Sequence, residues 1–330
     1  MKTTSRKWLG WIGLVAILLV IVFVFGPRLW TKQDSGKGVK RVFVNQYVTQ
    51  PILDAVLAGM QERLAVEGNI EVVVKNSNAD AMTCRQINEQ FVQQRPDVLV
   101  ALGTPAAQSA VEVAKGVIPV VFGAITDPVG AGLADSLEAP GGNKTGTTNR
   151  WPFDEQVRLI RQLLPQASSV GIIVNPGEEN CNAGVAAFRE AATKEGLTLV
   201  EVPATNSAEV NAAAEVLVGK KVDVILVSPS NTLFSAFNSL ISKADSAGIP
   251  VIGGDESAVQ QGSVATYGFS NKDVGIATAE IILEILKGGK DAGSIPVAKP
   301  KQNHLFVNEE ALKKANLTIP SELKELVINE

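Results

Sequence analysis

The chain is organised around the stretch Ile118-Pro119-Val120-Val121-Phe122-Gly123-Ala124-Ile125-Thr126-Asp127-Pro128-Val129-Gly130-Ala131-Gly132. Its first half is a short apolar run, rich in β-branched residues and followed by polar residues and glycines. This pattern predicts a buried parallel strand that runs into an exposed turn, where we expect a ligand. Asp127-Pro128 also predicts a helix start, because aspartate accepts from first-turn N–H groups and proline has none to lose. Helix capping alone explains Asp127 equally well.

Apolar strand patterns alternate with helical patterns along most of the chain. The expected strands are 41–45, 70–74, 98–102, 119–122, 170–174, 198–202, 222–227 and 250–252. The expected helices are 52–64, 86–93, 105–114, 156–164, 183–194, 208–218 and 233–247. Steady alternation predicts an α/β protein with parallel sheets covered by helices on both faces.

One strand, helix and strand unit occurs twice. The segment 95–121 is echoed by 221–252, since both place Asp-Val at the start of the first strand and Ile-Pro-Val at the start of the second. We therefore expect the same unit to be built twice, in two lobes. Two unrelated copies of a common unit are the alternative.

Four strand ends carry a small polar residue directly before a proline. These junctions are Thr104-Pro105, Asp127-Pro128, Asn175-Pro176 and Ser228-Pro229. In open parallel sheets the carboxyl ends of strands border the ligand crevice, and helix N-termini there offer N–H groups and partial positive charge to anions. Two such rims would form a cleft rich in donors; four ordinary helix caps are the alternative.

Composition narrows the classes of function. A chain of 330 residues is long for one core, which favours two lobes, and a net charge of -4 does not indicate nucleic-acid binding. The single histidine, His304, leaves histidine metal sites and Ser-His-Asp catalysis poorly supplied, although carboxylate or lysine chemistry stays open. Cys84 and Cys181 can form at most one bridge, and we favour two unpaired thiols.

The N-terminus predicts a membrane segment. Residues 1–7 form a short tail with three basic residues, residues 8–26 an apolar run, and residues 27–39 a polar linker. The run is long enough to cross a bilayer and too long for a typical signal-peptide core. We expect an uncleaved transmembrane anchor and an extracytoplasmic body; a long cleaved signal is the alternative.

Several motifs together resemble a known family. They are Thr104-Pro105-Ala106-Ala107-Gln108, Ile118-Pro119-Val120-Val121-Phe122, Thr126-Asp127-Pro128-Val129-Gly130-Ala131-Gly132-Leu133, Pro140-Gly141-Gly142-Asn143-Lys144-Thr145-Gly146 and Leu163-Leu164-Pro165. In order and spacing they resemble the ABC transporter substrate-binding proteins of the tryptophan/tyrosine type, over about residues 41 to 320.

The resemblance implies a type I periplasmic-binding-protein fold, with two doubly wound parallel-sheet lobes, a hinge and an interlobe cleft. Lobe 1 would hold 40–148 and about 254–290, and lobe 2 would hold 149–253 and about 291–330. Many relatives begin with a lipoprotein cysteine or a cleavable signal, and this chain departs from them there. The mode of anchoring stays open for that reason.

The implied function is that of a solute-binding protein of an ABC importer. It would bind a small molecule, in known members an aromatic amino acid, and deliver it to a membrane permease with its ATPase. No cofactor, metal, nucleic acid or catalysis is expected, and the protein would be a monomer in the cell membrane. Alternatives are a membrane-anchored sensor of the same fold and, more remotely, an extracytoplasmic enzyme that uses Asp127 and Asp255 as acid and base.

An amino-acid ligand needs donors for its carboxylate and an acceptor for its ammonium group. Thr104, Thr126 and Ser230 are candidate donors, and Asp127 or Asp255 is the candidate partner of the ammonium group. Further candidate ligand-binding residues are Asn175 and Asn231, which can serve either end, and Gln46 and Tyr47, which follow the first strand.

The aromatic residues Tyr47, Trp151, Phe234 and Tyr267 are candidate walls for an aromatic ligand. Each can instead be ordinary core, and for Phe234, on a helix, core is favoured.

Overall fold

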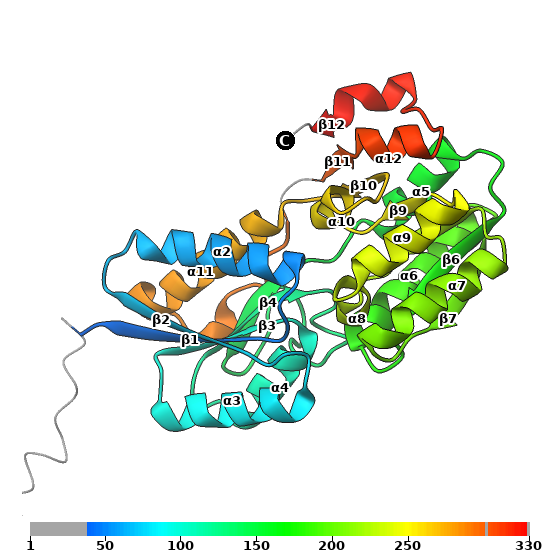
Figure 1. The fold of residues 1–330 in the computed structure, drawn as a ribbon. Helices are drawn as coiled ribbons and strands as arrows, with labels where there is room; N and C mark the ends of the chain where they lie inside the picture. The colour runs from blue at the N-terminus through cyan, green and yellow to red at the C-terminus, as the bar shows by residue number, and fades with distance from the viewer. Residues whose placement is uncertain (1–37, 301–302, 329–330) are drawn as a thin grey trace, which may run out of the picture. The chain divides into compact units, whose positions relative to one another are not determined.

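The first of two parallel sheets lies in the N-terminal half of the body. The computed structural model describes residues 38–300 and 303–328, and residues from Lys40 onward belong to one compact unit. The sheet has the order β2-β1-β3-β4-β5. Its strands are β1 (Lys40–Gln46), β2 (Ile70–Asn76), β3 (Val98–Leu102), β4 (Val120–Ile125) and β5 (Lys144–Thr148). Helices α2 (Pro51–Ala65) and α11 (Asn271–Gly288) cover one face, and α3 (Ala81–Gln94) and α4 (Thr104–Ala114) cover the other (Figure 1).

The second parallel sheet has the order β7-β6-β8-β9. Its strands are β6 (Ser169–Val174), β7 (Thr198–Pro203), β8 (Val224–Val227) and β9 (Val251–Gly253). The helices around it are α5 (Phe153–Leu163), α6 (Glu179–Lys194), α7 (Val210–Gly219), α8 (Asn231–Phe234) and α9 (Phe237–Ala247). Helix α5 packs on α6, and α7 packs on α9.

A small third sheet completes the described fold. In it β10 (Ala265–Gly268) pairs antiparallel with β11 (His304–Val307), which pairs parallel with β12 (Val327–Ile328). The remaining elements are α10 (Glu256–Gln260), α12 (Glu309–Lys314) and the 3-10 turns η2 (Ser207–Glu209), η3 (Ala292–Ser294) and η4 (Ser321–Leu326).

The eight predicted strands are confirmed within a few residues, and so is the twofold use of one unit. Both sheets place the second strand at the edge, followed by the first, third and fourth strands. In each sheet the third and fourth strands pair in parallel, at Leu99↔Val120 in the first and Ile225↔Val251 in the second. The central strands β3 and β8, which are apolar and rich in β-branched residues, are fully buried, as is typical of parallel sheets.

Two local predictions were wrong. No helix follows Asp127-Pro128. Strand β4 ends at Ile125, and residues 128–132 form turns. The predicted helix 233–247 begins earlier and is broken at Ser235 and Ala236, which separate α8 from α9.

The expected membrane segment, residues 8–26, lies outside the described residues. Among the residues that are described, no helix is long and apolar enough to cross a membrane.

The packing of the C-terminal third suggests other lobe boundaries than the expected ones. Helix α11 packs on α2, and the Thr145 hydroxyl donates to the Ile295 carbonyl (2.7 Å), so 271–298 accompany the first sheet. Residues 254–268 accompany the second sheet, since the Gln156 amide donates to the carbonyls of Gly254 and Tyr267 (2.7 Å each). We therefore propose that the chain enters lobe 1 near 270, not 254, and leaves it near 300, not 290.

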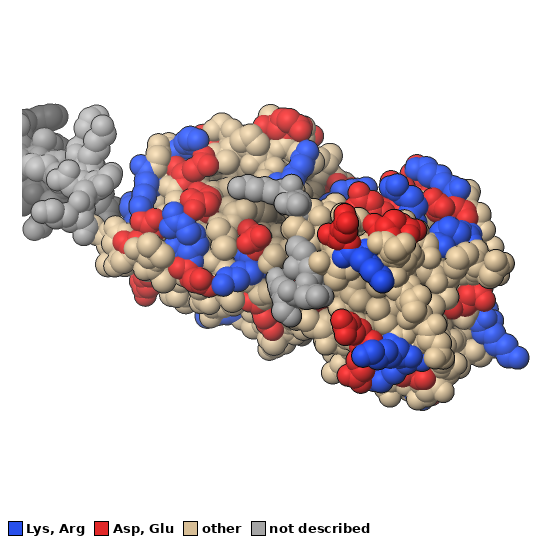
Figure 2. Space-filling model, turned by 90° about the horizontal axis from the view of Figure 1, so that it is seen from above, with Lys and Arg blue, Asp and Glu red and all other residues tan. Residues whose placement is uncertain are grey.

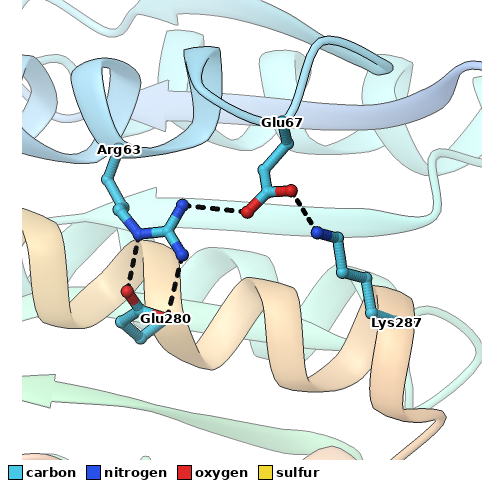
Figure 3. A network of polar contacts seen from close by, with 4 residues as sticks. All are labelled: Arg63, Glu67, Glu280 and Lys287. Atoms are coloured by element: carbon cyan, nitrogen blue, oxygen red, sulfur yellow. Dashed lines mark hydrogen bonds and ion pairs between the residues drawn. The ribbon is translucent and has the colours of Figure 1, made fainter.

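Ion pairs join α2 to α11 across more than 200 residues of sequence (Figure 3). The Arg63 guanidinium of α2 contacts Glu67 (2.9 Å), which follows the end of α2, and Glu280 (2.6 Å) on α11. Lys287 of α11 also pairs with Glu67. Partly exposed pairs of this kind contribute little each. On the face in Figure 2, basic and acidic side chains are interspersed, so that view shows no broad patch of one sign.

Asp223 provides a test of stability against pH. The backbone N–H groups of Ser168 and Ser169 donate to its Oδ2 (2.8 Å each), and these bonds lower the pKa of Asp223 to about 2. A folded pKa below the unfolded value means stability that is present above about pH 4 and lost as the pH falls toward about 2. We expect Asp223→Asn to flatten the decline in urea-unfolding free energy between these pH values. Parallel wild-type and variant profiles would contradict this role.

Candidate binding site

A small pocket lies where the two lobes meet. Three segments of lobe 1, the 149–151 crossing and two segments of lobe 2 contribute to it. This interlobe pocket is lined by Gln50, Ile52, Leu53, Gly103, Thr104, Ala124, Thr126, Asn149, Trp151, Asn180, Pro229, Ser230, Asn231 and Phe234. The lining contains polar, aliphatic and aromatic side chains and, within the described residues, no charged one.

Unpartnered polar atoms are concentrated in this pocket. Among the described residues, eight buried side-chain nitrogen or oxygen atoms lack a hydrogen-bond partner, and six of them belong to pocket-lining residues. Such atoms are costly to bury and rare in native proteins, so a cluster of them indicates a ligand site. The six are Gln50 Oε1, Thr104 Oγ1, Asn149 Oδ1, Trp151 Nε1, Asn180 Oδ1 and Asn231 Nδ2.

The pocket is nearly closed. A buried hydrogen bond from Gln50 Nε2 to Asn231 Oδ1 (2.8 Å) crosses it from lobe 1 to lobe 2. The cavity volume is about 20 Å³, which is room for about one water molecule. A ligand much larger than a water molecule would therefore fit only if the segments that line the pocket moved apart.

Thr104 places a hydroxyl group and a helix N-terminus at the lobe 1 side. It is the first residue of α4, and the cap position belongs to Gly103, whose φ of 92° favours glycine. The Thr104 side chain is therefore not used as a cap; it is 2% exposed and its Oγ1 is unpartnered. A hydroxyl donor beside the positive end of a helix suits a carboxylate.

Aromatic rings form one wall of the pocket. The Trp151 and Phe234 rings meet edge to face with centroids 6.2 Å apart, and Phe234 also stacks on Phe237 at 5.3 Å. The unpartnered Trp151 Nε1 adds a donor to this wall. Trp151 and Phe234 thus line the pocket, whereas Tyr47 and Tyr267 do not.

Four predicted site residues, Thr104, Thr126, Ser230 and Asn231, come together in the pocket. Ser230 also caps α8, because its Oγ accepts from the Leu233 N–H (3.2 Å).

The two predicted ammonium partners do not line the pocket. Asp127 accepts from the Gly130 N–H (2.9 Å) and lines a neighbouring cavity of about 410 Å³, the side cavity, together with Arg150 and Lys299. Asp255 is fully buried, and its burial raises its pKa. It caps α10 through the Ala258 N–H (3.2 Å) and accepts from Ser257 and Asn271.

Three further predicted residues hold loops near the pocket without lining it. Gln46 donates to Asp54 (2.6 Å). Tyr47 donates to the Ala79 carbonyl (3.1 Å), and burial, followed by the negative charge of Glu178, raises its pKa to about 12. Asn175 accepts from the Gly177 N–H (2.9 Å) and donates to Thr232 (2.8 Å).

Sequence reasoning missed Gln50, Asn149 and Asn180. Gln50 stands before Pro51 at the end of the loop after β1, but the pattern of the four predicted junctions requires a small polar residue before the proline, which glutamine is not. Asn149 follows β5, a strand that was not predicted. Asn180 lies at the start of α6 and carries no such signal.

Cys84 and Cys181 are buried and unpaired, and they belong to different hydrophobic clusters. The described residues include no group of three or more His, Cys, Asp or Glu side chains that could hold a metal ion.

Comparison with known proteins identifies relatives over nearly the whole body. The family model "ABC transporter substrate binding protein" matches residues 41–328. A tyrosine-binding protein of Clostridioides difficile is 34% identical over 287 residues, covering 86% of this chain and 82% of that protein.

Two solved structures are similar in both sequence and fold. An ABC domain from Streptococcus pneumoniae in complex with L-Trp is 31% identical with a TM-score of 0.83, covering 88% of this chain and 99% of that chain. The ligand-free, open structure of a substrate-binding protein with adhesive properties from Clostridium difficile is 33% identical with a TM-score of 0.66, covering 88% and 99%.

Proposed function

Because the chain belongs to the ABC transporter substrate-binding protein family, we propose that it binds an aromatic amino acid, L-tyrosine or L-tryptophan, in the interlobe pocket. The observation that carries this proposal is the cluster of six unpartnered polar atoms beside the Trp151 and Phe234 rings. A pocket with polar side chains but no charged one suits a zwitterion, whose net charge is zero, better than a net cation or anion.

The ligand's two charged groups have different partners in this proposal. The carboxylate lies at the α4 N-terminus, with Thr104 Oγ1, Trp151 Nε1 and Asn231 Nδ2 as donors. The ammonium group is held by amide oxygens, of which Asn180 Oδ1, Asn149 Oδ1 and Gln50 Oε1 have no other partner. Asp127 and Asp255 take no part in this assignment.

Binding proceeds by closure of the lobes around the ligand. The Gln50–Asn231 hydrogen bond and the small cavity describe a closed pocket. The higher TM-score with the L-Trp complex than with the ligand-free open structure supports the same interpretation, because the sequence identities are similar.

The same proposal includes an extracytoplasmic body and delivery of the ligand to a permease with its ATPase. Its support is the family membership and, for a membrane anchor at residues 8–26, the uninterrupted apolar sequence there.

Thermal unfolding of the full-length protein against a panel of amino acids tests the proposed ligand class. At a ligand concentration of 100 times the Kd, binding to the folded state adds about 2.7 kcal/mol, so we expect L-tyrosine or L-tryptophan to raise the Tm by several degrees. Tyramine, which lacks the carboxylate, is the matched control and should give a much smaller shift. Equal shifts with tyramine, or no shift with any amino acid, would contradict the proposal.

A further inference from the structure

Glu178 is a buried carboxylate directly behind the interlobe pocket. It precedes α6, is 6% exposed, and pairs with no Lys or Arg side chain among the described residues. Burial of a carboxylate without a cation is costly unless hydrogen bonds replace the lost water. Hydrogen bonds must therefore offset the cost of burying the Glu178 carboxylate.

Glu178 accepts five hydrogen bonds from residues around the pocket. Its Oε2 accepts from the Asn231 backbone N–H (2.6 Å) and from Asn180 Nδ2 (3.4 Å). Its Oε1 accepts from the Thr232 N–H (2.9 Å), the Thr232 hydroxyl (2.6 Å) and Asn175 Nδ2 (3.1 Å). The carboxylate thus holds the first turn of α8, the side-chain amide of Asn175 in the loop after β6 and that of Asn180 at the start of α6.

These bonds orient the two pocket amides. Asn180 Nδ2 donates to the Pro229 carbonyl (2.6 Å) and to Glu178, so only its acceptor Oδ1 remains for the pocket. Asn231 is held at its backbone by Glu178 and at its Oδ1 by Gln50, so its donor Nδ2 remains. An acceptor and a donor are therefore presented in fixed orientations.

The negative charge also reaches the pocket through Asn180. An amide whose N–H groups donate to a carboxylate is polarised, so its oxygen becomes a stronger acceptor. A cationic group on Asn180 Oδ1 would stand one amide away from Glu178 in a buried environment, where attraction between charges is stronger than in water.

Resting on the proposed function, we infer that Glu178 is a positioning residue that orients Asn180 and Asn231 and, through Asn180, selects ligands that carry an ammonium group. It does not touch the ligand, because both its oxygens are occupied. The site thus distinguishes ligands with an ammonium group from ligands without one through the charge of Glu178, which lies outside the neutral pocket lining.

The test uses two ligands that differ in the ammonium group alone. Calorimetric titration of the full-length protein gives the Kd of L-tyrosine and of 3-(4-hydroxyphenyl)propionate; for a tryptophan binder the pair is L-tryptophan and indole-3-propionate. We expect Glu178→Gln to weaken the amino acid by about 10- to 100-fold more than the propionate, because both ligands use Asn231 but only the amino acid uses the relayed charge. The matched control is Glu179→Gln, which removes an exposed neighbouring charge and should leave the ratio of the two Kd values as in the wild type.

The outcomes separate this inference from the proposed function. Equal weakening of both ligands in Glu178→Gln would overturn the inference and leave the function standing, since it would show a structural role alone. A wild-type protein that binds neither ligand would overturn the function, and the inference with it. If Glu178→Gln does not fold, Asn180→Ser is measured instead. Loss of the relaying amide should raise the Kd of the amino acid relative to that of the propionate by a similar factor. An unchanged ratio of these two Kd values would overturn the inference.

Discussion

Replacing Asn231 by alanine is expected to weaken the binding of L-tyrosine or L-tryptophan by about 100- to 1,000-fold. Asn231 serves the closed pocket twice, since its Oδ1 accepts the interlobe bond from Gln50 and its Nδ2 is free to donate to a ligand. Alanine removes both bonds and leaves the buried Gln50 Nε2 without a partner. A lost bond to a charged group costs about 1.5–3 kcal/mol and an unpaired buried donor about 1–3 kcal/mol. Together they cost about 2.5–6 kcal/mol, and the expected factor corresponds to the lower half of that range.

The matched control for this prediction is Asn182→Ala. Asn182 is an exposed residue of α6 whose amide donates to the Pro176 carbonyl (3.0 Å), outside the interlobe pocket. It should bind like the wild type in the same calorimetric titration. An Asn231→Ala protein that is folded and binds within about threefold of the wild type would show that Asn231 is not part of the site.

Gly275→Ala is expected to give the largest loss of stability among glycine substitutions in α11, about 2–3 kcal/mol net. A Cβ atom at Gly275 would lie 2.0 Å from the Val56 carbonyl oxygen of α2, so backbone would meet backbone and neither could turn aside. Gly59 makes the reciprocal approach from α2, 2.2 Å from the Lys272 carbonyl oxygen. The helices would have to separate, at an overpacking cost that exceeds the roughly 1 kcal/mol gained in helix propensity.

Gly288→Ala in the same helix is the control. There the nearest atom to a new Cβ is the flexible Lys290 Cγ at 3.8 Å, so the propensity gain should make this variant neutral or slightly more stable. Urea unfolding at neutral pH measures both. A Gly275→Ala protein as stable as Gly288→Ala would contradict the close packing of α2 on α11.

Separation of these helices also bears on the site. Helix α2 begins directly after Gln50 and carries Ile52 and Leu53 into the pocket lining. Gly275→Ala should therefore weaken ligand binding as well as stability, although it lies outside the pocket.

The fold could be predicted well from the sequence because its signal is local. Runs such as Val98–Leu102 are apolar, β-branched and bounded by helical patterns, and the structure buries all five residues. The strand Lys144–Thr148 was missed because its sequence, Lys-Thr-Gly-Thr-Thr, has no apolar run, and only its pairing with β4 makes it a strand. The helix expected after Asp127 is absent because Asp127-Pro128-Val129-Gly130 closes a single turn through the Gly130 N–H instead.

The site could be predicted only in part, because its residues are joined by tertiary contacts. Thr104 and Asn231 lie within four residues of a strand end and were predicted as site residues near such ends, and Gln50 lies four residues after the end of β1. Charge complementarity pointed to Asp127 and Asp255, whereas the pocket lining is neutral and the nearby carboxylate, Glu178, acts from behind it. Which strand-end carboxylate turns inward depends on loop geometry that no periodicity encodes.

A crystal structure of the protein grown with L-tyrosine or L-tryptophan would show directly whether the interlobe pocket binds an aromatic amino acid. We expect one amino acid enclosed between the lobes, with its carboxylate within hydrogen-bond distance of Thr104 Oγ1 and Asn231 Nδ2 and its ammonium group on Asn180 Oδ1. A ligand held instead by Asp127 in the side cavity, or an interlobe pocket that stays without ligand at saturating concentration, would contradict it.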